Sequence, residues 1–451
     1  MMIDLSLVDT IVIVMMENRS FDHMLGHLSY REYANGTSVE GLRDPLTQQA
    51  YENLYEGSPY YPFLMADGPL PSDPPHERQS VETQLAYSPV TGTYSMSGFV
   101  EAYYQSTPVS RTQTPEPMGF FPPSAVPIMN VLANNFAVCD RWFAALPTGT
   151  QPNRLMALTG ASRVDDTRDQ LLPAGPTLLD WATSREVRWR VYHAGLSFFI
   201  LLGRFDQVLG PNFRAFEQLA YDVGHEAADL FPQLILIEPS YADAPHLGSE
   251  HPNDDHPPLA VGFGEQFLRQ IYEALTCNPE RWAKTVLIVT YDEHGGFFDH
   301  VPPRAVPYAP PDAAYPPFAT TGVRVPALVV SPLVAARHVY SEPLDHTSIL
   351  QFLAERFSPD EGGYSPEVNQ RRALGIMSVS EVLNLSSPRP VIPAVPREPI
   401  QSMALLGPGP PEKTPNQRAF ENAALTMINR YPRETAQKHP ELWHWYLTTQ
   451  P

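Results

Sequence analysis

Four runs of consecutive apolar residues, rich in Val, Ile and Leu, recur along the chain. They lie at residues 10–16, 233–239, 285–291 and 325–331. Uninterrupted runs of this kind are typical of strands in a parallel sheet that is covered on both faces. Segments with helical spacing lie between them, at residues 123–135, 151–161, 177–185, 264–275 and 346–357. The alternation predicts an α/β fold with a mostly parallel central sheet sandwiched by helices, and ligands in such folds bind at the carboxyl ends of the strands.

Two regions depart from this alternation. Residues 30–125 are rich in Tyr, Pro, Gly and Ser and show weak periodicity, which predicts a loop-rich insertion that folds over the site. After Leu385 the sequence becomes Pro-rich and then contains one helical pattern, at residues 419–431. We therefore expect a main domain over residues 1–385 and an extension over residues 386–451, with one helix, packed on the main domain.

Composition narrows the possible partners and compartments. The 451 residues carry a formal net charge of −20 with no run of Lys or Arg, so we expect no nucleic-acid partner. No apolar stretch approaches the roughly 20 residues that span a bilayer. The N-terminus lacks a basic region and a small-residue cleavage site, which predicts a cytoplasmic location for the chain as given, or a secreted or periplasmic one if a leader has been removed.

Acidic and amide residues directly follow two of the apolar runs. Glu17 and Asn18 follow residues 10–16, and Asp292 and Glu293 follow residues 285–291. Strand ends of a parallel sheet meet at one edge, and three carboxylates in one place repel one another unless a cation lies between them. Oxygen donors favour Ca²⁺, Mg²⁺ or Mn²⁺, and nearby histidines would also admit Zn²⁺. The alternative is an ordinary set of solvated loop acids.

The segment PTGTQPNR precedes an apolar helical pattern. Its spacing places Thr150 as a helix N-cap, with Pro152 in the first turn. A helix N-terminus favours a phosphate, and a hydroxyl beside a metal is a candidate nucleophile. The alternative is a helix cap without chemistry. Arg154, in the same segment, is a further candidate for the site.

Five histidines lie in turn-like contexts rich in proline, acidic residues or glycine. They are His76, His251, His256, His294 and His346. Imidazoles can hold phosphoryl oxygens, protonate a leaving group or bind a second metal. We favour His76, His256 and His346 over the other two. Asp254 and Asp255 either orient His256 or bind metal, and spacing does not decide between these roles.

Several blocks together resemble a known family. They are ENRSFDHMLG at residues 17–26, TQPNRL at 150–155, NDDHPP at 253–258 and TYDEHGGFFDHVPP at 290–303. In this order they resemble the bacterial phospholipase C and acid phosphatase family, whose phospholipase branch includes the plant non-specific phospholipases C. The resemblance implies an alkaline-phosphatase-like fold and metal-assisted phosphoryl transfer, with residues 1–385 as the catalytic domain.

The resemblance also assigns roles to residues. It implies that Glu17, Asn18, Asp292 and Glu293 bind one divalent cation together with Thr150, the nucleophile. It places His76, His256 and His346 around the phosphate. The implied activity is hydrolysis of phospholipids such as phosphatidylcholine through a phosphothreonine intermediate. The alternatives are an acid phosphatase acting on monoesters and an inactive metal- or lipid-binding protein, and the oligomeric state is left open.

Overall fold

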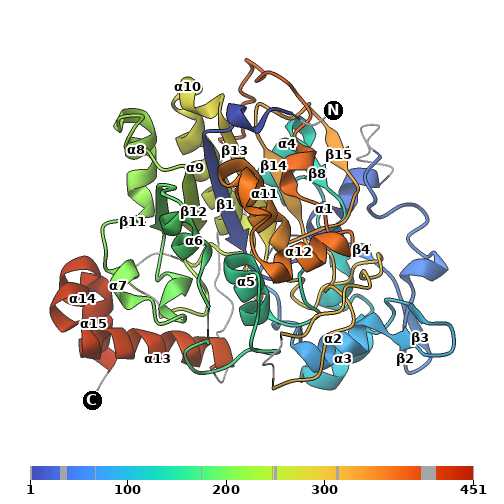
Figure 1. Cartoon of the computed structure of the whole chain (residues 1–451). Helices are drawn as coiled ribbons and strands as arrows, with labels where there is room; N and C mark the ends of the chain where they lie inside the picture. Colours follow the sequence, from blue (N-terminus) through green and yellow to red (C-terminus); the bar gives the residue numbers. More distant parts are fainter. Residues whose placement is uncertain are drawn as a thin grey trace.

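An eight-stranded sheet forms the centre of the computed structural model (Figure 1), with strand order β11-β10-β12-β1-β13-β14-β8-β15. The structure describes residues 3–30, 38–66, 68–173, 175–245, 247, 251–310, 314–397 and 413–449. The strands are β1 (Thr10–Met16), β8 (Ala137–Cys139), β10 (Trp189–His193), β11 (Phe213–Ala215), β12 (Leu234–Glu238), β13 (Thr285–Tyr291), β14 (Ala327–Val330) and β15 (His338–Tyr340).

The two strands that carry the predicted acidic ends are neighbours in the middle of this sheet. β1 pairs in parallel with β12 on one side and with β13 on the other, and Met16 lies opposite Tyr291. Every residue of β1 and β13 is buried, as expected for strands covered on both faces. The predicted fold class, with a mostly parallel sheet sandwiched by helices, is therefore confirmed.

One predicted strand runs against the others. β14 is antiparallel to both β13 and β8. A parallel partner needs a crossover connection, usually a helix. The described part of residues 292–326 contains no helix. The chain therefore returns from the end of β13 without a crossover, and β14 must run in the opposite direction.

The predicted helices of the main domain all form. They are α4 (Pro127–Asn135), α5 (Thr150–Thr159), α6 (Leu178–Ser184), α9 (Gly262–Thr276) and α11 (Thr347–Phe357). Figure 1 shows α5 and α11 in front of the sheet and α9 behind it. The shorter elements are α1 (Phe21–Leu25), α7 (Phe205–Val208), α8 (Leu219–His225), α10 (Pro279–Trp282), α12 (Pro366–Ala373), β9 (Trp142–Phe143) and β16 (Leu344–Asp345).

The insertion contains short elements and a small core of its own. They are α2 (Arg78–Leu85), α3 (Phe99–Ser106), β2 (Asn53–Tyr55), β3 (Ser58–Tyr60), β4 (Phe63–Leu64), β5 (Tyr87–Ser88), β6 (Thr93–Tyr94) and β7 (Gly119–Phe120). Val81 and Phe99 pack in a buried cluster with Phe298, which follows β13. This packing fixes the insertion on the segment beyond β13, at the carboxyl edge of the sheet.

The C-terminal extension holds more helix than predicted. In place of one helix at residues 419–431, the structure has α13 (Pro415–Arg430), α14 (Pro432–Lys438) and α15 (Pro440–Thr449). Each begins with a proline, which is tolerated in a first turn and interrupts the apolar periodicity of the preceding helix. In the described residues, no helix is long and apolar enough to cross a membrane. The predicted domain boundaries stay predictions.

Candidate active site

The two acidic strand ends meet, as the sequence predicts. Glu17, Asn18, Asp292 and Glu293 are all fully buried. The backbone N–H of Asn18 donates to Asp292 Oδ1 at 3.3 Å, across a separation of 274 residues. The same Asp292 oxygen accepts the N–H of Glu293 at 2.7 Å. The carboxyl ends of β1 and β13 thus form one polar centre.

Two glycines allow the chain after β13 to approach the chain after β1. Asn18 has a φ of +60° and Gly295 a φ of +62°. A Cβ on Gly295 would lie 2.1 Å from the carbonyl oxygen of Asn18, and one on Gly296 would lie 2.7 Å from that of Pro75. Only glycine fits such an approach. The HGG sequence therefore brings Asn18 and the segment that precedes His76 to the same place.

Three further residues of the ENRSFDH block contact the other sequence blocks of the site. Ser20 Oγ donates to the carbonyl of Phe298 at 2.7 Å, and the ring of His23 stacks on Phe297 with 3.8 Å between centroids. Arg19 Nε donates to the carbonyl of Asp255 at 2.8 Å. The three sequence blocks around residues 17–24, 253–258 and 292–300 are therefore structurally interlocked.

A buried ion network lies next to this centre. Arg324 pairs with Asp22 at 3.1 Å and with Asp299 at 2.8 Å. His300 Nδ1 lies 2.6 Å from the second oxygen of Asp22. Burial alone would raise the pKa of Asp22, but His300 and Arg324 together hold it below its usual value. These four residues are mutually satisfied, which suits a structural role.

Arg154 lies in the middle of the candidate site. Its Nη2 lies 3.1 Å from Glu17 Oε1, and its Nε lies 3.0 Å from Asp292 Oδ2. Nη1 donates to the Tyr241 hydroxyl at 3.0 Å, and the guanidinium lies over that ring at 4.8 Å. One cationic side chain thus compensates part of the charge of the buried carboxylates.

Part of that charge has no partner in the protein. Glu17 Oε2 and Glu293 Oε1 accept no hydrogen bond from a described residue, and Glu17 Oε1 has only the ion pair with Arg154. Burial raises the pKa of Glu17 well above its usual value, despite Arg154. Burial likewise raises the pKa of Asp292 to about 6. Unpartnered, buried carboxylate oxygens in an oxygen-only donor set fit a hard divalent cation.

Thr150 lies beside this donor set, although not as the predicted helix cap. The N-cap of α5 is Gly149, and Thr150 is the first helical residue. Its hydroxyl is therefore not used in capping, and it donates to Asn18 Oδ1 at 3.3 Å. A Cβ on Gly149 would lie 2.6 Å from Glu77 Oε2, so a larger residue there would require that carboxylate to move. The hydrogen bond to Asn18 places the Thr150 hydroxyl beside the end of β1.

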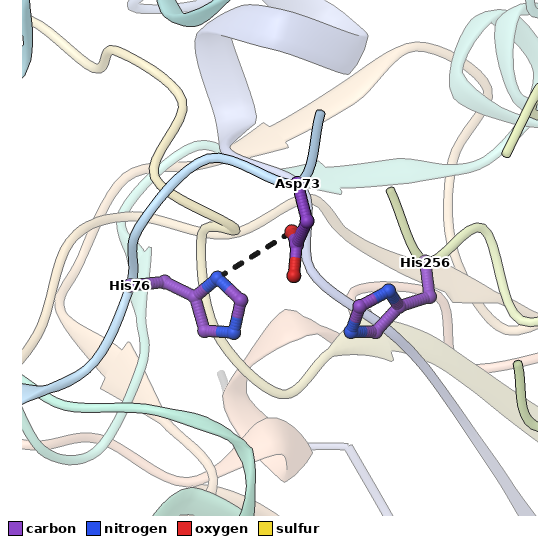
Figure 2. A group of neighbouring side chains, drawn as sticks. All are labelled: Asp73, His76 and His256. Carbon is purple, nitrogen blue, oxygen red and sulfur yellow. Dashed lines mark ion pairs between the residues drawn. The ribbon is translucent and has the colours of Figure 1, made fainter. Parts of the chain in front are cut away.

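Two of the predicted histidines meet at an unpredicted aspartate. Figure 2 shows the imidazoles of His76 and His256 on either side of the Asp73 carboxylate. One ligand atom from each of the three lies within 4.8 Å of the others. His76 Nε2 also lies 3.3 Å from Asn18 Nδ2, which joins this cluster to the strand ends.

The charge around the two imidazoles favours their protonation. Burial alone would lower the pKa of His256, but Asp73, Asp243 and Glu17 raise it to about 9. Burial is likewise outweighed at His76, where Glu293 and Asp73 raise the pKa to about 10. A cation held by Glu293 would oppose the effect of that carboxylate on the pKa of His76.

His346 is at the site, but both of its ring nitrogens have protein partners. Nε2 lies 2.6 Å from the carbonyl of Asp292, and Nδ1 accepts from Trp142 Nε1 at 3.3 Å. Burial lowers the pKa of His346 to about 4. A neutral imidazole that donates to a backbone carbonyl orients Asp292, so this geometry does not make His346 the proton donor.

Comparison with known proteins places the chain in a family. Residues 8–358 match the Phosphoesterase family. The chain belongs to this family. The resemblance drawn from the sequence blocks is therefore confirmed.

Relatives within the Phosphoesterase family carry phospholipase C names. The chain is 33% identical to non-specific phospholipase C6 of Arabidopsis thaliana, over 74% of this chain and 64% of that protein. It is 31% identical to phospholipase C A of Mycobacterium tuberculosis, over 78% of this chain and 73% of that protein. The match therefore spans less than two thirds of the plant enzyme.

Among solved structures, a phosphonate monoester hydrolase of Agrobacterium radiobacter gives a TM-score of 0.30 at 13% identity. The match covers 51% of this chain and 68% of that chain, and the likeness is weak.

The remaining candidate residues divide into those that lie at the candidate active site and one that lies away from it. His294 is buried between Glu293, at 3.2 Å, and Gln84, at 2.7 Å. Asp255 accepts the Tyr291 hydroxyl at 2.5 Å. Asp254 accepts the backbone N–H of His256 at 3.1 Å. Whether Asp254 and Asp255 orient His256 or bind metal stays a prediction. His251 is exposed and packs on Phe263, so the structure does not bring it to the site.

Three residues of the site were not predicted. Asp73 lies three positions before His76, and this acidic neighbour was the available signal. Glu77, whose pKa is raised by burial to about 8, follows the same histidine. Tyr241 follows β12 in an irregular segment, and no pattern in the sequence distinguishes it from other tyrosines.

Proposed function

We propose that the chain is a metal-dependent phosphoesterase that hydrolyses phosphodiesters in the manner of a phospholipase C. The observation that carries the proposal is that buried carboxylates from two strand ends, with Glu17 Oε2 and Glu293 Oε1 unpartnered, lie together with Asn18, which accepts a hydrogen bond from the Thr150 hydroxyl, beside a pair of histidines. The phospholipase C names of the relatives support the same reaction class.

Glu17, Asn18, Asp292 and Glu293 would hold the cation, together with the Thr150 hydroxyl. Their oxygen donors favour Ca²⁺, Mg²⁺ or Mn²⁺, and the neighbouring histidines would also admit Zn²⁺. When bound, such an ion supplies positive charge that neutralises phosphoryl oxygens and lowers the pKa of a nearby hydroxyl. Arg154 keeps the carboxylates in place by pairing with Glu17 and Asp292.

Thr150 would act as the nucleophile. Once its hydroxyl proton has passed to solvent, its Oγ would form a bond to phosphorus while the bond from phosphorus to the leaving alkoxide breaks, which leaves the phosphoryl group on Thr150. Asn18 orients Oγ by accepting its hydrogen bond. The first peptide N–H groups of α5 then face the transferred phosphoryl group, as at other helix N-termini that bind phosphate.

His256 would move the protons. With a pKa raised to about 9 it carries a proton at neutral pH, and it gives that proton to the leaving alkoxide. It then takes a proton from the water that cleaves the phosphothreonine and regenerates Thr150. Asp254 holds the backbone of His256, and Asp73 lies next to its ring. His76 would donate to or accept from a phosphoryl oxygen beside Asn18.

The proposed substrate is a phospholipid such as phosphatidylcholine, on the strength of the relatives' names. A phosphomonoesterase uses the same groups and differs in the leaving group and in the charge of the ester. Hydrolysis of p-nitrophenylphosphorylcholine therefore needs to be compared with that of p-nitrophenyl phosphate. Faster hydrolysis of the diester supports the phospholipase C assignment, and faster hydrolysis of the monoester supports an acid phosphatase.

Thr150→Ala tests the proposed nucleophile. We expect diester hydrolysis to fall by about 10³-fold or more, since a covalent step is removed. Thr150→Ser is the matched control, because it keeps the hydroxyl, and it should retain substantial activity. Circular dichroism and metal content check that both variants fold and bind the ion. Undiminished turnover by folded, metal-loaded Thr150→Ala would rule out the assignment, and a wild-type protein that binds metal but hydrolyses neither ester would indicate a binding protein.

A further inference from the structure

A second cavity lies between the sheet and the C-terminal helices. It has a volume of about 1240 Å³, and its lining includes His193, Gly195, Arg214, Ser240, Lys438 and His439. His193 is the last residue of β10, and His439 joins α14 to α15. The cavity lining includes none of Glu17, Asn18, Thr150, Asp292 and Glu293. The cavity is therefore separate from the candidate active site.

Two buried imidazoles lie side by side in its lining. His193 is 8% exposed and His439 is 2% exposed, and their ring centroids are 5.5 Å apart. In the part of the chain that the structure describes, the Nε2 atoms of both rings are buried and have no hydrogen-bond partner. A buried polar nitrogen without a partner destabilises the folded state, so two adjacent ones point to a ligand.

The other nitrogen of each ring has an oxygen acceptor. His193 Nδ1 lies 2.7 Å from the carbonyl of Gly195, which can only accept, so Nδ1 carries the hydrogen. His439 Nδ1 lies 3.5 Å from Glu441 Oε1, a carboxylate that favours the same tautomer. Each Nε2 then presents a lone pair. Imidazoles that bind metals have this arrangement, with the second nitrogen donating to a carbonyl or carboxylate.

The separation of the rings suits one shared ion. With Zn–N distances of about 2.0–2.1 Å, two imidazoles at a roughly tetrahedral angle place their ring centres about 5 Å apart. The observed separation of 5.5 Å is close to this value. Two Nε2 lone pairs would repel an anion, so a phosphate is not a fitting occupant.

We propose that His193 and His439 bind one transition-metal ion of the Zn²⁺ class through their Nε2 atoms. Imidazole nitrogen is preferred by such ions over Ca²⁺ or Mg²⁺, so this ion differs in kind from the one proposed for the active site. Water molecules in the cavity can complete the coordination. The ion would fasten the C-terminal helices to the end of β10.

Zinc stoichiometry tests the site. Metal-free protein is incubated with Zn²⁺ in the Glu17→Gln/Asp292→Asn background, which disables the candidate active site, and bound zinc is measured by mass spectrometry after gel filtration. We expect one Zn²⁺ per chain and a rise of several degrees in Tm. In the same background, His439→Gln and His193→Gln should each lose both effects. His444→Gln is the matched control, because His444 is exposed on α15, and it should retain both.

A milder variant keeps the test valid if a buried substitution prevents folding. Glu441→Gln changes a partly exposed residue and should weaken Zn²⁺ binding by about 10-fold, through loss of the carboxylate on His439 Nδ1. The proposal is overturned if the background protein binds no Zn²⁺, if folded His439→Gln keeps the full stoichiometry, or if Glu441→Gln leaves the affinity unchanged. None of these outcomes depends on hydrolytic activity.

Discussion

Glu17 shows most clearly how the candidate site lowers the stability of the fold. Its carboxylate is completely buried, Oε2 accepts no hydrogen bond from a described residue, and Oε1 has only the ion pair with Arg154. Burial disfavours the ionised form more than Arg154 favours it, so the pKa of Glu17 is raised. The folded state therefore binds a proton at Glu17 more tightly than the unfolded chain does. At neutral pH, without a cation, the ionised side chain opposes folding.

Glu17→Gln should accordingly stabilise the metal-free protein while abolishing its response to metal. A group with a raised pKa contributes stability below its unfolded value near 4.5, and this contribution is lost as pH rises through the folded value. Relative to Glu17→Gln, metal-free wild type should therefore lose stability steadily as pH rises above about 4.5. Tm measured at several pH values checks this, with each 1 kcal/mol shifting Tm by roughly 2–4 °C.

The same measurement has a clear contrary outcome. If Glu17→Gln unfolds at lower temperature than metal-free wild type at pH 8, the Glu17 carboxylate stabilises the fold through Arg154. The claim that this carboxylate opposes folding without a cation is then refuted. Addition of Mg²⁺ or Ca²⁺ should raise the Tm of wild type and leave that of the variant unchanged.

Residues of the candidate site could be predicted from the sequence only where a residue type suited to the chemistry also stands directly after a strand. Glu17, Asn18, Asp292 and Glu293 could be predicted because polar residues directly follow buried strands. The relation of His346 to Asp292 could not, since it depends on the direction of a ring that the spacing does not determine. Asp73 was missed because, although the insertion was predicted to fold over the site, the sequence did not indicate that the DPPHE turn in particular lies against Asn18.

At the scale of elements, the loop after β13 is the most constrained part of the site. Gly295 combines a left-handed φ of +62° with a position against the carbonyl of Asn18. Gly375 has a φ of +89° but no atom within 4 Å of a Cβ placed on it. The two glycines thus share the backbone requirement and differ in the close contact.

Alanine at each position separates these contributions. Gly375→Ala should cost about 1–2 kcal/mol for the left-handed conformation. Gly295→Ala should cost on the order of 3 kcal/mol or more, because a backbone carbonyl cannot yield as a side chain can, and it should also weaken metal binding by moving Asn18. Urea unfolding and metal titration provide the measurements. Equal costs at both positions would contradict the role assigned to the contact.

Element boundaries could be predicted where apolar patterns were uninterrupted. β1 and β13 were predicted to the residue. The direction of β14 was not predicted, and it follows from the lack of a crossover helix in the described part of residues 292–326. In the C-terminal extension, Pro432 and Pro440 start new helices, and the apolar period of α13 alone carried the prediction of one helix.

At the scale of the whole molecule, the C-terminal extension supports the site through aromatic contacts. Phe420 of α13 is completely buried and lies 5.6 Å from Tyr241, ring to ring. Tyr241 in turn accepts a hydrogen bond from Arg154. Gln151 of α5 also contacts Asn416 of α13, 265 residues further along the chain. The helix α13 therefore contacts the elements around the carboxylates.

Phe420→Ala should therefore lower both stability and activity. Loss of a buried phenyl ring costs about 3–5 kcal/mol. Activity should fall because Tyr241 loses its packing partner and Arg154 its fixed position. Tyr221→Ala, at a side chain that is 67% exposed, is the control and should change neither quantity measurably. Full activity in folded Phe420→Ala would show that the extension does not support the site.

The net charge of the chain affects how it would bind to a membrane that contains the proposed phospholipid substrate. The chain carries a formal charge of −20, and an anionic membrane surface repels such a protein. Activity on phosphatidylcholine vesicles should fall on the order of fivefold when anionic lipid is added at low salt, and 0.5 M NaCl should largely restore it by screening. A rise in activity with anionic lipid would indicate a basic docking surface, contrary to this expectation.

The pairing of β1 with β13 also bears on how the protein is made. Glu17 emerges from the ribosome early, while its partners Asp292 and Glu293 emerge only after the strand that ends at Tyr291 has been synthesised. Until then the nascent polypeptide cannot capture an ion with this set of ligands, whatever its concentration in the surroundings. If the proposed ion binds there, the site can form only late in translation, and binding of the ion would report that the middle of the sheet has closed.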